Sequence, residues 1–387
     1  FAKVPEAQYV VGGTTQGTKK GLTLLVKFPD RLGDATITRE QVNNYCNQTS
    51  THYTEFGNNG SVAEYFYEVS NGKLIYTNHV ANYYTAKNNR SYYTDETASG
   101  RARELVIEAL NALESSGFDF RTCDMDGDGY VDALNCFYAG AIVNAWAKGL
   151  WPHAGGISWQ SSRTGIRVRS YQITNMGSSL TLGTFCHENG HMLCKFPDVY
   201  DYNGDSNGGA GRFCLMNGGG HGTNPTPPNG YLRFKAGWGS AETISSSASF
   251  YRNLVATNGR MYLNQFLVYY NPSNSKEYFL IENRNKDGRD AGIPCGGIAV
   301  WHVDEEGNHN YQNYTHQTSH NNYEVALIQA DNQRHFERNI NGGDVNDLFY
   351  AGNTASGYKN EFSDTSDTGP YDNNSHWWSG AASKLRL

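Results

Sequence analysis

The sequence contains few charged residues and no long hydrophobic run. Charged residues make up 18% of its 387 positions, while aromatic residues reach 13%. A disordered chain would carry more charge and fewer aromatic residues, and a membrane-spanning helix would need about 20 consecutive apolar residues. We therefore expect a folded protein without a membrane span. At roughly 100–200 residues per domain, the length favours two domains.

Clusters of basic residues and closely paired cysteines are also missing. The net charge is −7, and lysine and arginine gather only in pairs such as Lys19-Lys20, so we expect no nucleic-acid partner. The seven cysteines form no CxxC motif of a zinc ribbon or redox site, and we expect them to be buried or partly paired in disulfides. Five Asn-X-Ser/Thr sequons favour an exported protein, although the first residues lack the pattern of a secretory signal. We expect a secreted, extracellular monomer whose signal peptide is absent from this chain.

Patterns of both strands and helices occupy the first half of the chain. Strands are predicted at 22–28, 130–138 and 167–173, the last as an edge strand because polar and apolar residues alternate there. A capping box predicts a helix at 61–69, and apolar residues at helical spacing predict another at 101–115. This half is therefore expected to be an α+β domain.

Strand patterns dominate beyond Trp238. They occur at 266–270, 278–282, 297–303 and 325–329, and no helical pattern of comparable quality recurs there. The simplest organisation is an N-terminal arm at 1–20, an α+β domain at 21–240 and a mostly β domain at 241–387.

The most informative motif is HExxH, formed by His187, Glu188 and His191. Residues four apart on a helix project from one face, so the two histidines can offer ring nitrogens to one Zn²⁺ while Glu188 stands beside the open position. There Glu188 can accept a proton from water that the metal activates for attack on a peptide carbonyl. A helix that merely carries two histidines is the alternative interpretation, because the short motif also occurs by chance.

A zinc hydrolase needs a third protein ligand, and two aspartates follow the motif. Asp198 comes after a Phe-Pro turn that cannot continue the helix, and Asp201 is the alternative. Further on, a turn-rich segment contains Met216 and is similar to the methionine turn beneath the zinc of metzincin peptidases. We also expect one cysteine of the HExxH segment, Cys186 or Cys194, to form a disulfide with Cys214.

An acidic loop at 124–132 has the spacing of a calcium-binding loop. Its first, third, fifth and ninth positions hold Asp124, Asp126, Asp128 and Asp132. Asn135 stands at the twelfth position, where a bidentate glutamate is usual. A structural Ca²⁺ site and a plain turn are equal alternatives here. A second oxygen-rich stretch at 201–207 is either a further calcium site or a solvated loop.

Many of these motifs occur in the same order in a known family. Further matching stretches are LLVKFPD at 24–30, EYFLIENR at 277–284, GGIAVWHVD at 296–304 and GDVNDLF at 343–349. Over residues 22–384 the chain resembles the secreted metallopeptidases of the immune inhibitor A type. The resemblance implies a zinc-dependent endopeptidase that acts on protein or peptide substrates, with a metzincin-like catalytic domain and a β-rich domain behind it. It also implies that His187, His191 and Asp198 hold the zinc and that Glu188 is the general base.

Three positions depart from the family pattern. Members commonly have glycine at the seventh position after the first histidine, where a helix can end with positive φ, but this chain has Cys194. The aspartate commonly falls ten residues after that histidine, whereas Asp198 falls eleven after it. We expect a wider turn that still points Asp198 at the metal. Gly218 stands where some metzincins have a substrate-stabilising tyrosine, which leaves Tyr200 and Tyr231 as candidates.

A catalytically inactive adhesin or glycan-binding protein on a peptidase scaffold is the second class of function. Its β domain would bind glycans through aromatic pairs such as Trp377-Trp378. The intact Glu188 argues against this class, because an inactive descendant has little reason to keep the base together with both histidines. We therefore expect an active endopeptidase that binds extended peptides along an edge strand such as 167–173.

Overall fold

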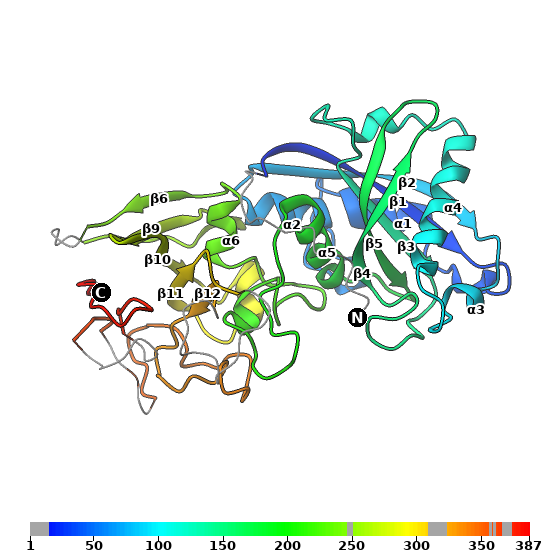
Figure 1. Cartoon of the computed structure of the whole chain (residues 1–387). Coiled ribbons are helices and arrows are strands. Elements are labelled where there is room, and N and C mark those ends of the chain that lie inside the picture. Colours follow the sequence, from blue (N-terminus) through cyan, green and yellow to red (C-terminus); the bar gives the residue numbers. More distant parts are fainter. Residues whose placement is uncertain (1–14, 246–250, 309–322, 356–357, 359–360, 366–373) are drawn as a thin grey trace. The chain divides into compact units, whose positions relative to one another are not determined.

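The protein is described from a computed structural model of the chain (Figure 1). The described residues are 15–245, 251–308, 323–355, 358, 361–365 and 374–387. Contacts between residues divide the chain into two compact units. The first comprises 15–67 and 72–195, and the second comprises 68–71 with the described residues from 196 onward. Most of the predicted arm at 1–20 lies outside the described residues, and the domain bounds near 20 and 240 stay predictions.

The first unit is built on a five-stranded sheet in the order β2-β1-β3-β5-β4. Neighbouring strands run parallel except β4, which is antiparallel to β5 and forms one edge of the sheet. The strands are β1 (Gly17–Lys27), β2 (Leu74–Thr85), β3 (Ala133–Ala139), β4 (His153–Gln160) and β5 (Arg167–Met176). The strands predicted at 22–28 and 130–138 are confirmed as β1 and β3.

The prediction that 167–173 is an edge strand was wrong. This segment forms β5, which pairs with β3 on one side and with β4 on the other. Its first residues alternate because Val168 is buried while Arg167 and Arg169 are exposed. Alternation reports which face of a strand is buried, and it carries no information about whether the strand has two neighbours. The edge of the sheet is instead β4.

Helices cover both faces of this sheet. They are α1 (Arg39–Asn47), α2 (Val62–Val69), α3 (Arg90–Tyr93), α4 (Arg101–Ser115) and α5 (Leu182–Cys194). The predicted helix at 101–115 coincides with α4, whose apolar side shares a buried cluster with alternate residues of β1. On the opposite face, Phe185 of α5 stacks on Phe137 of β3, with ring centroids 5.1 Å apart. The predicted capping box at the start of α2 is also confirmed, since Ser61 and Glu64 exchange hydrogen bonds.

The second unit contains another five-stranded sheet, in the order β12-β11-β10-β9-β6. Its strands are β6 (Ser240–Thr243), β9 (Gln265–Asn271), β10 (Asn274–Arg284), β11 (Gly297–Asp304) and β12 (Val325–Leu327). All neighbouring pairs are antiparallel except β6 with β9. A short pair, β7 (Thr257–Asn258) with β8 (Met261–Tyr262), and one helix, α6 (Gly230–Lys235), complete its regular elements among the described residues, apart from short 3-10 turns. The four strands predicted beyond Trp238 are therefore confirmed.

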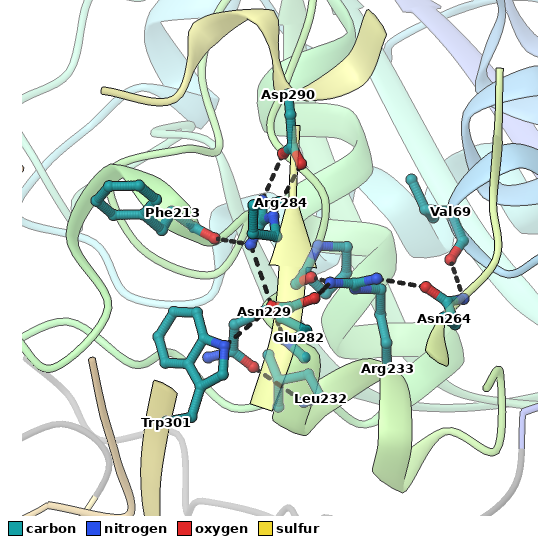
Figure 2. Close-up of polar contacts among 12 residues, drawn as sticks. Val69, Phe213, Asn229, Leu232, Arg233, Asn264, Glu282, Arg284, Asp290 and Trp301 are labelled. Carbon is teal, nitrogen blue, oxygen red and sulfur yellow. Dashed lines mark hydrogen bonds and ion pairs between the residues drawn. The ribbon is translucent and has the colours of Figure 1, made fainter. Parts of the chain in front are cut away.

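A network of buried charges joins α6 to β10 inside this unit (Figure 2). Glu282 of β10 forms ion pairs with Arg233 of α6 and with Arg284, and Arg284 pairs with Asp290. The indole of Trp301 also donates a hydrogen bond to Glu282 at 2.9 Å. Burial works to raise the pKa of Glu282, but the two arginines outweigh it and lower that pKa. Two cations and two anions thus share one dry interior site.

The structure also tests the disulfide expected from the sequence. All seven cysteines are buried and none forms a disulfide, so the expected disulfide from Cys186 or Cys194 to Cys214 was wrong. The sulfur of Cys214 instead accepts the backbone N–H of Asn229 at 3.4 Å.

Within the described parts of the chain, we find no helix with the length and apolar character needed to cross a membrane.

Candidate active site

The HExxH motif lies on α5, a helix that is almost completely buried. His187 and His191 follow each other by one turn, and their ring centroids are 4.9 Å apart. Glu188 is only 9% exposed and His191 only 7% exposed. Charges act on one another more strongly in such an enclosed place than in bulk water. The helix therefore presents two imidazoles and one carboxylate in a partly dry environment.

Asp198 completes a group of three metal-binding side chains. His187, His191 and Asp198 each offer one donor atom, and these atoms all lie within 4.8 Å of one another. Two imidazole nitrogens and one carboxylate oxygen are a donor set that zinc accepts, with a fourth position left open in hydrolases. The hydroxyl of Tyr202 donates to Oδ2 of Asp198 at 2.7 Å, as outer partners of metal ligands commonly do. The residues present therefore fit a zinc ion.

The end of α5 explains the unusual spacing of Asp198. The helix continues through Cys194, and the left-handed residue that ends it is Lys195, with φ 57° and ψ 29°. In the family pattern, a left-handed residue and then an aspartate follow the first histidine at fixed spacings. In this chain, the left-handed residue and Asp198 each lie one position further along the sequence. The ammonium of Lys195 donates to the carbonyl of Met192 at 2.6 Å and helps to close the last turn. The expected wider turn is thus a helix lengthened by one residue.

The segment around Met216 is hydrogen-bonded to the chain beside Asp198. Met216 is completely buried, and its carbonyl accepts the N–H of Val199 at 2.9 Å. The amide of Asn217 returns a hydrogen bond to the carbonyl of Val199 at 2.8 Å. These two bonds fix the backbone directly after Asp198, so the methionine segment supports the loop that carries this aspartate.

A buried polar network holds α5 on the sheet, and the sequence analysis did not anticipate it. Asn189, next to Glu188, accepts a hydrogen bond from Tyr76 of β2 at 2.7 Å and donates to Asn135 of β3 at 2.9 Å. Gln172 of β5 also donates to Asn135 at 3.2 Å. Strands β2 and β3 thereby hold the helix directly through Asn189, and β5 supports it through Asn135. The sequence does contain a signal for this network, namely polar residues inside otherwise apolar segments. At Asn135, however, the polar residue was considered only as a departure from the calcium-loop pattern, in which a glutamate ligand is usual.

Asp201, the alternative third ligand, lies outside the metal-binding group. Its carboxylate accepts hydrogen bonds from the backbone of Asn203 at 3.3 Å and from the backbone and hydroxyl of Ser206 at 3.0 and 3.1 Å. Burial raises the pKa of Asp201 despite these bonds. The arrangement closes the loop at 201–206 on itself.

The same loop contains a Gly-X-Ser-X-Gly pattern at 204–208, which in α/β-hydrolases marks a nucleophilic serine. There the serine would stand on a sharp turn between a strand and a helix. Ser206 instead lies in a loop without such elements, and its hydroxyl donates to Asp201. The pattern therefore gives no support to a serine hydrolase.

The acidic loop at 124–132 brings three of its four aspartates together. Asp124, Asp126 and Asp128 offer donor atoms within 4.8 Å of one another. Asp132 accepts the backbone N–H of Lys20 at 2.7 Å, and the ammonium of Lys19 pairs with both Asp126 and Asp132. A lysine thus already provides positive charge at this loop.

The two tyrosines suggested as substrate-stabilising phenols differ in their surroundings. Tyr231 is buried, and its hydroxyl donates to Glu324 at 2.5 Å. Burial and the charge of Glu324 raise the pKa of Tyr231 well above its usual value. Tyr200 is partly exposed, with its ring centroid 5.2 Å from that of Tyr202. The hydroxyl of Tyr231 is therefore already engaged in a buried hydrogen bond.

Comparison with known proteins identifies one family. The model described as immune inhibitor A peptidase M6, catalytic domain, matches residues 6–236. The match covers more than half of the chain and includes α5, Asp198 and Met216. A search of curated proteins found no match.

Proposed function

Because the chain belongs to the immune inhibitor A family of metallopeptidases, we propose that it is a secreted zinc endopeptidase with Glu188 as its general base. The observation that carries this proposal is the close approach of three donor atoms beside an enclosed Glu188. The family supports a peptidase acting on proteins with the help of a metal. The choice of zinc follows from the donor set of two histidines and one aspartate.

Each site residue has a separate task in this proposal. His187 and His191 would hold the metal through ring nitrogens, and Asp198 through a carboxylate oxygen that Tyr202 helps to orient. Zinc, when bound, supplies a Lewis acid that polarises the scissile carbonyl and lowers the pKa of a water molecule. Glu188 takes the proton from the attacking water and passes it to the leaving amine. Its burial keeps bulk water from competing for that proton.

We propose that substrate peptides bind in extended form along β4. On its side away from β5, this strand has no neighbour among the described residues, so its backbone groups can pair with a peptide. Gly155 and Gly156 lie within β4 and leave its backbone without covering side chains of their own. The strand at 153–160 thereby replaces 167–173, the segment that the sequence favoured.

Hydrolysis of casein, measured together with the zinc content, tests the proposed function. Glu188→Gln should keep the metal and lower hydrolysis by about 10²–10⁴-fold, because only the proton acceptor is lost. His191→Ala should lose activity together with the zinc held at the HExxH site, so that it binds one equivalent less than the parent protein, and a chelator should abolish hydrolysis by the parent. Glu40→Gln, on the exposed side of α1, is the matched control and should be unaffected. Near-normal hydrolysis by Glu188→Gln would contradict the mechanism.

The inactive glycan-binding alternative receives little support from its aromatic pair. Trp377 is buried and stacks on Tyr269 and Phe279, with ring centroids 5.7 and 5.0 Å away. Trp378 stacks on His302 at 4.6 Å. Both indoles therefore contribute to packing within the second unit.

A structural calcium ion in the acidic loop is a further part of the proposal. The three converging carboxylates of Asp124, Asp126 and Asp128 support it. The ion would have to compete with Lys19, which pairs with Asp126.

A further inference from the structure

A second group of metal-binding side chains lies in the second unit, in the loops after β12. Asp331, His335 and Asp344 each offer one donor atom, and these atoms lie within 4.8 Å of one another. Asp331 is buried, whereas His335 and Asp344 are partly exposed. The group is therefore enclosed at one end and accessible to an ion at the other.

Hydrogen bonds hold this group in place without the help of regular secondary structure. The side-chain oxygen of Gln329 accepts the N–H of His335 at 2.7 Å, and its amide donates to Glu337 at 2.8 Å. The imidazole of His335 lies 2.8 Å from Oδ2 of Asp344. Further along, the N–H of Ala330 donates to the carbonyl of Asp347 at 2.9 Å, which ties the two loop ends together. The donor atoms are thus positioned before any ligand arrives.

A fourth carboxylate, that of Asp347, supplies an independent sign of a ligand. Asp347 is completely buried, and its Oδ1 has no hydrogen-bond partner in the described parts of the chain. Its Oδ2 accepts the backbone N–H of Asp344 at 2.5 Å, so this carboxylate lies next to one member of the group. A buried polar atom without a partner destabilises the folded protein, and does so more strongly when it is charged. An ion bound by this oxygen would remove that destabilisation.

The charges around Asp347 point the same way. The negatively charged side chains of Asp344, Asp331 and Glu337 all lie near the carboxylate of Asp347. Arg212 and Lys286 lie in the pocket that Asp344 helps to line, but they donate to the carbonyls of Gly343 and Pro294. The crowded carboxylates therefore lack a balancing cation from these two side chains.

We propose that Asp331, His335, Asp344 and Asp347 bind a divalent transition-metal ion that stabilises the second unit. The ion is of the zinc or manganese class, because imidazole suits transition metals, whereas calcium prefers six to eight oxygen ligands. The site involves none of the residues of the HExxH motif. Its role is structural, since no unused proton acceptor comparable to Glu188 belongs to the described group.

The test uses the full chain carrying His191→Ala, so that metal at the proposed active site does not obscure the second site. The protein is stripped with a chelator and given Zn²⁺, Mn²⁺ or Ca²⁺ separately, and bound metal and melting temperature are measured. We expect one equivalent of Zn²⁺ or Mn²⁺ to bind and to raise the melting temperature. Asp344→Asn should weaken this binding at least tenfold, whereas Asp287→Asn, at an exposed aspartate of the same unit, should not change it.

Asp347→Asn gives a second readout that does not depend on affinity alone. In chelator, this variant should melt at or above the temperature of the parent, because one crowded carboxylate has been removed. The increase in melting temperature on adding metal should be lost. Metal binding that survives both Asp344→Asn and Asp347→Asn, binding of Ca²⁺ alone, or the absence of any bound metal would overturn the proposal. None of these readouts is peptide hydrolysis, so the outcome is independent of the proposed function.

Discussion

Asp198 and Asp201 differ in what surrounds their carboxylates, and this difference can be tested by substitution. The carboxylate of Asp198 has an oxygen close to a ring nitrogen of each histidine, whereas the carboxylate of Asp201 accepts hydrogen bonds within its own loop. Asp198→Asn should therefore weaken zinc retention far more than Asp201→Asn, which should mainly lower stability. Equilibrium dialysis against a zinc buffer measures the first effect, and thermal unfolding measures the second. Equal zinc affinity in the two variants would remove Asp198 from the ligand set.

The residues of the site differ in how far the sequence could predict them. The histidines and Glu188 could be proposed as site residues from the sequence because their spacing on one helix is a local property. The positions of Asn189 and Asn135 were not, because their contact joins α5 to β3 across 54 residues of sequence. Polar partners so distant in sequence leave no periodic pattern, and only the folded chain brings them together.

The end of α5 provides a test at the level of a single element. Lys195 has a left-handed backbone, which costs a residue with a side chain about 1–2 kcal/mol relative to glycine. Lys195→Gly and Lys195→Ala both lose the hydrogen bond to Met192, but only glycine relieves the backbone. We expect Lys195→Gly to be more stable than Lys195→Ala by about 1 kcal/mol in chemical denaturation. Equal stabilities would show that the helix does not end in this conformation.

The acidic loop provides the second test at this scale. If it binds calcium, a chelator too weak to strip zinc should lower the melting temperature, and added Ca²⁺ should restore it. Asp126→Asn should abolish the response, while Asp119→Asn, at a partly exposed aspartate that pairs with Arg121, should retain it. A melting temperature insensitive to Ca²⁺ in the parent protein would favour a plain turn closed by Lys19.

Elements were predictable where one local pattern decides the structure. The helix at 101–115 agrees with α4 because apolar spacing and a following glycine both act within the segment. The position of β5 within its sheet was mistaken, since pairing depends on distant strands. The end of α5 was expected to be unusual, but the left-handed residue itself could not be located from the missing glycine alone.

For the molecule as a whole, stability should depend on the buried charges of Figure 2 more than on surface ion pairs. Glu282→Gln leaves Arg233 and Arg284 without a full counter-charge, and we expect a loss of about 3–5 kcal/mol in the free energy of unfolding. The matched control is Glu242→Gln, whose exposed pair with Arg252 should contribute no more than about 1 kcal/mol. Urea unfolding followed by tryptophan fluorescence compares the two. A Glu282→Gln variant as stable as the control would show that the network is dispensable.

The seven buried thiols offer a way to follow local opening along the chain by covalent labelling. Burial raises the pKa of Cys136 to about 12 and that of Cys214 to about 11, so the closed protein presents almost no reactive thiolate near neutral pH. An alkylating reagent therefore reaches each cysteine only when the surrounding element opens. Because Cys136 lies in β3, Cys186 in α5 and Cys295 near β11, the labelling rates at single positions would rank the opening of both units without any engineered probe.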